Sequence, residues 1–149
     1  MPPSPGSDSS FVQALGAAAP GSNGGPSSDW LKPDLGASVG AVMTARSIGL
    51  DGSHSQSPYD GFNLGTHVGD DPLAVQANRD HLQTAIGMPA LWLNQVHGNV
   101  VVRATPDLAQ SPKVLDADGS LTTEPGVICT VMVADCLPVL LAAPGGRGV

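Results

Sequence analysis

Short apolar runs, separated by turns rich in glycine and proline, dominate the pattern of this chain. Residues 39–44 (VGAVMT) form a short apolar run with β-branched side chains, and they predict a strand. Two further strands are predicted at 91–93 and 100–102, on either side of a polar segment. The near-continuous apolar run at 127–133 is typical of a strand buried on both faces, and residues 139–142 predict the last strand.

One helix is predicted together with both of its ends. Asp71 is a good N-cap, and Pro72 suits the first helical position because a missing N–H costs nothing there. Apolar side chains recur on one helix face at spacings of seven and four residues: Val75, Leu82 and Ile86. Gly87 then provides the left-handed residue that commonly ends a helix. Strands that alternate with one clear helix predict a mixed α/β or an α+β fold.

Residues 1–29 differ in composition from the rest of the chain. Seventeen of these 29 residues are proline, glycine or serine, and they show no hydrophobic period. Such a segment cannot bury enough apolar surface to offset the entropy lost on ordering. We therefore predict a disordered leader at 1–29 and one domain over 30–149.

The charge balance excludes several kinds of partner. Six lysines and arginines against 13 aspartates and glutamates give a formal net charge of −7. No basic surface for nucleic acid and no polybasic membrane-binding segment is expected from this balance. The pattern does not determine the oligomeric state.

Targeting signals are also missing from the pattern. The first basic residue is Lys32, so residues 1–29 lack the charged start of a secretory signal. The longest apolar run, 127–143, contains Asp135 and Pro138 and is shorter than a membrane span. Two cysteines do not make a disulfide framework, which favours a reducing, cytoplasmic location.

His97 and Cys136 are the side chains with the clearest chemical interest. Taken alone, a cysteine after an apolar strand is typical of a small buried hydrophobe, and a histidine in a turn is typical of a hydrogen-bonded surface residue. Neither residue has the partner spacing of a zinc motif, so spacing alone predicts no metal site. Cys129, inside the 127–133 run, is expected in the core.

Two glycine-containing loops leave alternatives open. Residues 46–53 could cradle an anion through Arg46 and backbone N–H groups, and an ordinary flexible loop fits the same sequence equally well. His67 lies between Gly65 and Gly69, where the backbone can approach a ligand closely.

Four strings occur in one order along the chain: 62–65 (FNLG), 67–72 (HVGDDP), 92–98 (WLNQVHG) and 133–139 (VADCLPV). Together they closely resemble the YfiH-like laccase-domain family, whose members are also called polyphenol oxidases or purine nucleoside phosphorylases. The resemblance covers residues 39–149. It implies an α+β fold, arranged as a layered α/β sandwich with mixed β-sheets and flanking helices.

The resemblance also implies a mononuclear metal site, usually described as zinc, with copper in some members. It assigns His97 and Cys136 as metal ligands and implies no other cofactor. The family's third ligand, a histidine in an HAGWRG segment, has no counterpart in the 149 residues. We therefore expect the N-terminal part of a longer domain, with a fold that is incomplete at its C-terminus.

The implied activity is phosphorolysis of adenosine, inosine, guanosine and methylthioadenosine, with adenosine deamination as a second activity. Purine nucleosides and phosphate are thus the implied partners. Arg46 matches the arginine of an early family loop, although this loop lacks the family's double glycine. Asn63 and Gln95 match polar positions expected to orient substrate or metal ligands. Asp135 could orient a ligand, transfer a proton or cap the next turn.

Three alternatives to this function stay open. The same family supports a copper-dependent polyphenol oxidase, although four histidines are few for a multicopper enzyme. An inactive, truncated fragment would expose an unpaired apolar edge at 139–142. An amide hydrolase acting on misincorporated cell-wall building blocks is the third alternative.

Overall fold

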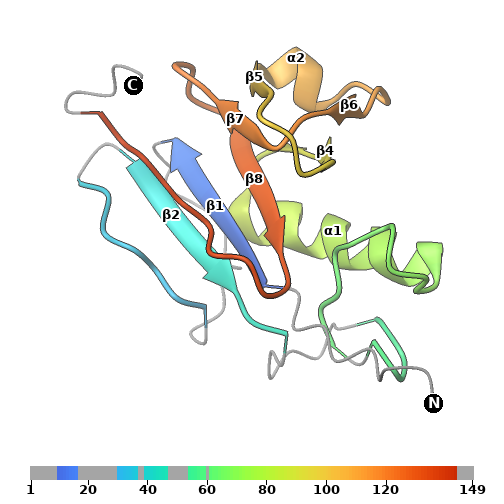
Figure 1. Ribbon diagram of the computed structural model, residues 1–149. Coiled ribbons are helices and arrows are strands. Elements are labelled where there is room, and N and C mark those ends of the chain that lie inside the picture. The colour runs from blue at the N-terminus through green and yellow to red at the C-terminus, as the bar shows by residue number, and fades with distance from the viewer. Residues whose placement is uncertain (1–9, 17–29, 37–38, 47–53, 60, 144–149) are drawn as a thin grey trace.

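The computed structural model describes residues 10–16, as backbone, together with 30–36, 39–46, 54–59 and 61–143. Ten elements occur among these residues (Figure 1). Eight are strands: β1 Ser10–Gly16, β2 Val39–Thr44, β3 Ala90–Leu91, β4 Leu93–Asn94, β5 Val101–Arg103, β6 Leu115–Asp116, β7 Gly119–Leu121 and β8 Ile128–Val133. Two are helices: α1 Pro72–Ile86 and α2 Pro106–Ala109. No helix in these ranges is long and apolar enough to cross a membrane.

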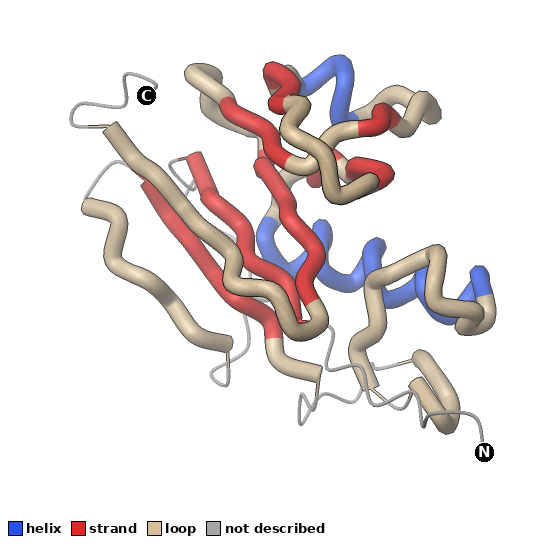
Figure 2. Tube along the Cα trace, in the orientation of Figure 1, coloured by secondary structure: helices blue, strands red, loops and turns tan. Residues whose placement is uncertain are grey.

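The main sheet has the strand order β2-β1-β8-β3 and is mixed. β1 is antiparallel to both of its neighbours, whereas β3 runs parallel to β8, with Ala90 opposite Ile128. Two small parallel pairs, β4 with β6 and β5 with β7, lie beyond the end of this sheet (Figures 1 and 2). Helices beside small sheets place this part of the chain in the predicted α+β class.

Helix α1 confirms the prediction at both ends. The Asp71 carboxylate accepts the Leu73 N–H at 3.0 Å, and Pro72 occupies the first helical position. Gly87 adopts a left-handed backbone with φ 76° and donates its N–H to the Gln83 carbonyl at 2.7 Å. Both ends therefore have their exposed backbone groups satisfied by the residues that the sequence provides there.

The core consists of two apolar clusters. The first lies where α1 meets the sheet and contains Trp30, Val42, Phe62, Leu64 and Leu82. The second lies under the small strand pairs and contains Leu91, Leu93, Ala104, Ala117 and Val127. The edge of β8 beside the second cluster carries the candidate site described below.

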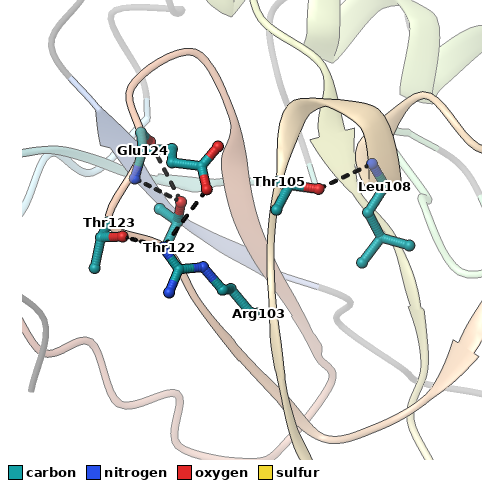
Figure 3. Close-up of polar contacts among 6 residues, drawn as sticks. All are labelled: Arg103, Thr105, Leu108, Thr122, Thr123 and Glu124. Carbon is teal, nitrogen blue, oxygen red and sulfur yellow. Dashed lines mark hydrogen bonds and ion pairs between the residues drawn. The ribbon is translucent and has the colours of Figure 1, made fainter.

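Side-chain bonds brace the small strand pairs (Figure 3). Arg103, at the end of β5, donates to Thr123 Oγ1 at 2.6 Å and pairs with Glu124 at 3.5 Å. Thr105 caps α2 by accepting the Leu108 N–H at 3.2 Å. The β5–β7 pair therefore has a polar clamp at the end where Arg103 pairs with Leu121.

The prediction of a disordered leader is wrong for residues 10–16. These residues form β1, which pairs with β2 on one side and with β8 on the other (Figure 1). The average composition of 1–29 concealed a segment, SFVQALG, with a single glycine and no proline. Two flanking strands satisfy the backbone of this segment on both edges. The rest of 1–29 lies outside the described residues.

Four strand predictions also need correction. Residues 139–142 are extended but form no strand with the rest of the described chain. The strand predicted at 91–93 is divided into β3 and β4 at Trp92, and the one predicted at 100–102 begins at Val101. β8 is buried at Ile128, Thr130 and Val133 but only half-buried between them, so its two faces are not equally covered.

Candidate functional site

A cavity of about 690 Å³ lies along the edge and the C-terminal end of β8. Three other segments form its walls, at 65–68, 95–98 and 118–120, the last of which includes the start of β7. Residues 134–140 close the cavity after β8 ends. Its lining includes these side chains with polar or reactive groups: His67, Gln95, His97, Asp118, Ser120, Cys129, Asp135 and Cys136. Four of the six site residues expected from the sequence thus line one cavity.

His97 is placed by a tight turn after β4. Its backbone is left-handed, with φ 57°, and its N–H donates to Asp118 Oδ1 at 2.7 Å. The next N–H, from Gly98, donates to Asp118 Oδ2 at 2.7 Å. A Cβ at position 98 would lie 3.2 Å from that carboxylate oxygen, so glycine allows the close approach. The contact joins residues 20 and 21 positions apart in the sequence, and no local motif indicates it.

Gln95 holds the same loop against β8. Its Nε2 donates to the Met132 carbonyl at 2.9 Å, and its Oε1 accepts the Met132 N–H at 2.7 Å. The amide therefore bonds the β8 edge as the backbone of a neighbouring strand would. This places Gln95 at the cavity with its amide already engaged by the protein.

Cys136 and Asp135 follow the end of β8, and both are exposed. The Cys136 thiol lies 3.9 Å from Asp135 Oδ1, within the range of a weak sulfur hydrogen bond. Cys129 lies within β8 and is half-buried, and burial raises the pKa of its thiol. Neither cysteine forms a disulfide.

The described residues do not form a complete metal site. Within the described ranges, no three histidine, cysteine, aspartate or glutamate side chains converge to hold an ion. His97 and Cys136 line the same cavity, but two donors fall short of the three protein ligands that a catalytic zinc uses. A third donor would have to come from outside the described residues.

Arg46 and Asn63 do not line the cavity. The Arg46 guanidinium donates to the Pro58 carbonyl at 2.8 Å, inside its own loop. Asn63 is buried; its side chain accepts the Gly65 N–H at 3.0 Å and donates to Asp70 Oδ2 at 2.9 Å. Residues 47–53, the rest of the anion-binding loop considered above, lie outside the described residues.

Arg79 contacts Met132, which lines the cavity, and it was not predicted as a site residue from the sequence. Its Nε donates to the Leu64 carbonyl at 2.9 Å, and its guanidinium carbon lies 4.1 Å from the centroid of the Trp92 ring. It also contacts Met132 Sδ at 3.7 Å. Burial lowers the pKa of Arg79 to about 10, which leaves it charged near neutrality.

Residues 41–149 match the family model described as multi-copper polyphenol oxidoreductase laccase. The chain is 47% identical over 122 residues to a purine nucleoside phosphorylase of Pseudomonas aeruginosa. This match covers 80% of this chain and 47% of the relative. The chain is also 44% identical over 100 residues to the purine nucleoside phosphorylase YfiH of Escherichia coli. This match covers 66% of this chain and 40% of the relative. The chain spans about half the length of these curated relatives, or less.

A solved structure supports the same relationship. It is the crystal structure of a Neisseria meningitidis protein assigned to the family model DUF152, with a TM-score of 0.58 and 30% sequence identity. The match covers 71% of this chain and 50% of that chain. The family model itself spans residues 41–149, well over half of the sequence. The resemblance seen in the sequence is therefore confirmed: the chain belongs to the family described as multi-copper polyphenol oxidoreductase laccase, which includes the YfiH-type proteins.

Proposed function

We propose that this chain supplies part of the active site of a purine nucleoside phosphorylase. The observation that carries the proposal is the cavity at the end of β8, where the segments around His97 and Cys136 meet. A volume of about 690 Å³ falls in the range of small-molecule sites. The relatives named purine nucleoside phosphorylase support this substrate class. Adenosine, inosine, guanosine and methylthioadenosine are the proposed nucleosides, with phosphate as the second substrate.

The proposed reaction forms a bond from a phosphate oxygen to the sugar C1′ and breaks the bond from C1′ to the purine. The leaving base must gain a proton, and the substrate must be held in line. Asp135, exposed at the cavity, is proposed to orient substrate or to transfer that proton. Gln95 contributes by holding the loop that carries His97 against β8.

Arg46 and Asn63 contribute to this proposal less directly. Arg46 would supply a positive charge for the phosphate dianion, but its guanidinium bonds the Pro58 carbonyl. Asn63 holds the loop from Gly65 to Asp70, next to His67 in the cavity wall. Arg46 therefore remains a predicted phosphate ligand, whereas Asn63 supports the wall of the cavity.

Zinc is the metal we propose for the family site in this chain. A thiolate with imidazole nitrogens is a donor set that zinc favours, and His97 with Cys136 provides two such donors at one cavity. The described residues provide no third donor at this cavity, so a bound zinc would need a further ligand from elsewhere. Adenosine deamination is proposed as a second activity of the same cavity. The two free cysteines fit the proposed cytoplasmic location.

The direct test is phosphate-dependent release of base. The full chain is incubated with inosine or adenosine, with and without phosphate, and products are separated by chromatography. We expect free base and ribose 1-phosphate only when phosphate is present, and His97→Ala and Cys136→Ala to lose this activity. His54→Ala is the matched control, because His54 is exposed and does not line the cavity. Base release without phosphate, or none at all, would contradict the proposal.

A copper-dependent polyphenol oxidase is the second candidate, because the matching family model carries that description. The whole chain has four histidines, few for several copper ions. Oxygen uptake with a phenol, measured after loading with Cu²⁺, would favour this candidate. Phosphorolysis without any oxygen uptake would reject it.

A further inference from the structure

We infer that Asp118 is a positioning residue, which sets the backbone of His97 and thereby where the His97 imidazole stands in the cavity. This inference rests on the proposed function, in which His97 acts at the cavity. Both oxygens of the Asp118 carboxylate are used, one by the His97 N–H and one by the Gly98 N–H, each at 2.7 Å. Hydrogen bonds to an ionised acceptor are the strong ones in proteins.

The backbone at His97 needs this support. Among the residues that the structure describes, His97 alone combines a side chain with a positive φ, at 57°. That conformation crowds the Cβ of an L-residue and is normally left to glycine. A glycine would remove the steric cost but also the imidazole. Strained conformations of this kind persist where the surroundings enforce them, and they cluster at functional sites.

Backbone hydrogen bonds to neighbouring segments hold Asp118 in place. Its N–H donates to the Val100 carbonyl at 3.0 Å, and the preceding N–H, of the buried Ala117, donates to the Asn94 carbonyl at 3.2 Å. On its other side, Gly119 pairs with Val101 in the β5–β7 pair. The carboxylate is thus presented from a turn that is bonded to the strands before and after the His97 loop.

The contact is also specific to one carboxylate in this turn. Asp116 lies two residues earlier, and its Oδ1 accepts from Asn94 Nδ2 at 2.7 Å. Asp116 does not line the cavity, and the His97 and Gly98 N–H groups donate to Asp118 instead. It therefore offers a matched control: the same residue type and the same bond length, without the link to His97.

The test compares Asp118→Asn with Asp116→Asn in the full chain. Asn keeps the size of Asp, but its NH₂ group replaces one of the two carboxylate oxygens. An NH₂ group cannot accept a hydrogen bond, so the His97 or the Gly98 N–H loses its acceptor. In Asp118→Asn we expect amide hydrogen exchange at His97 and Gly98 to accelerate by about tenfold or more, and the His97 backbone chemical shifts to leave the left-handed range. We expect kcat for phosphorolysis to fall by about tenfold with KM changed less than about twofold, as for misplacement of an acting group. Asp116→Asn should leave all these quantities unchanged.

Two results would overturn the inference: unchanged exchange and shifts at His97 in Asp118→Asn, or loss of protection there with kcat unchanged. If Asp118→Asn does not fold, Gly98→Ala takes its place, because the added methyl would press on Asp118 Oδ2 from 3.2 Å. If the unmodified chain shows no phosphorolysis, the proposed function fails, and the exchange and shift measurements alone decide whether Asp118 controls His97.

Discussion

Replacing Gln95 by alanine should destabilise the chain measurably, although the residue lies in a loop. The substitution removes both bonds to Met132, at 2.9 and 2.7 Å, and leaves a half-buried N–H and carbonyl of β8 without those partners. At roughly 1 kcal/mol for each hydrogen bond, the free energy of unfolding should fall by about 2 kcal/mol. For a domain of this size, that loss corresponds to a fall in melting temperature of about 6 °C.

Equilibrium unfolding in urea, followed by tryptophan fluorescence, measures this quantity. Gln110→Ala is the matched control, because Gln110 is exposed and its Nε2 makes one local bond, to the Pro106 carbonyl at 3.2 Å. We expect the control to change stability by less than about 0.5 kcal/mol. Gln95→Glu should be at least as harmful as Gln95→Ala, because a carboxylate oxygen would face the Met132 carbonyl. Equal stability of Gln95→Ala and Gln110→Ala would refute the role assigned to Gln95.

Three further changes test other parts of the structure. Leu82→Ala should lower the free energy of unfolding by about 2–5 kcal/mol, because Leu82 is fully buried. Leu73 is 79% exposed, so Leu73→Ala should change the free energy of unfolding little in the same urea titration. Iodoacetamide near pH 8 should label the exposed Cys136 before Cys129, because burial raises the pKa of the Cys129 thiol and so lowers its thiolate fraction. Mass spectrometry of the peptides measures the labelling, and equal labelling of the two cysteines would contradict this prediction. Leu141→Lys should reduce self-association in light scattering more than Leu73→Lys, since Leu141 is 72% exposed in an extended apolar segment; equal effects would contradict this.

The elements that the sequence predicted well are those defined by neighbouring residues. Asp71, Pro72 and Gly87 supply the ends of α1 within one turn of the helix itself, so no distant contact is needed to recognise them. The strands at 39–44 and 127–133 combine β-branched side chains with apolar runs and appear as β2 and β8. Their pairing partners could not be identified in the same way.

Strands that depend on distant partners were predicted poorly: one strand was missed, and one predicted strand did not form. Residues 10–16 have a weak apolar pattern but gain a neighbour on each edge, and they form β1. Residues 139–142 have a strong apolar pattern but pair with no other described segment, and Val139 is 70% exposed. Composition and periodicity report the preference of a segment, whereas a strand also requires a partner for its backbone.

The candidate site shows the same limit at the level of single residues. His97 and Cys136 stand in recognisable strings and line one cavity, whereas Arg46 stands in a recognisable loop and bonds Pro58 instead. Nothing near Asp118 in the sequence indicates that its carboxylate reaches the backbone of His97. That contact exists because the β4–β6 and β5–β7 pairs bring the two turns together.

Four of the polar residues around the cavity therefore fall into two groups with different expected effects. Gln95 and Asp118 bond the backbone of the chain, and they replace the ladder bonds that strands of two or three residues cannot supply. The imidazoles of His67 and His97 line the cavity without a hydrogen bond to the described part of the chain, so they remain available to a ligand. Substitutions in the first group should alter stability and the placement of the loop, and those in the second should alter ligand binding and chemistry while the fold persists.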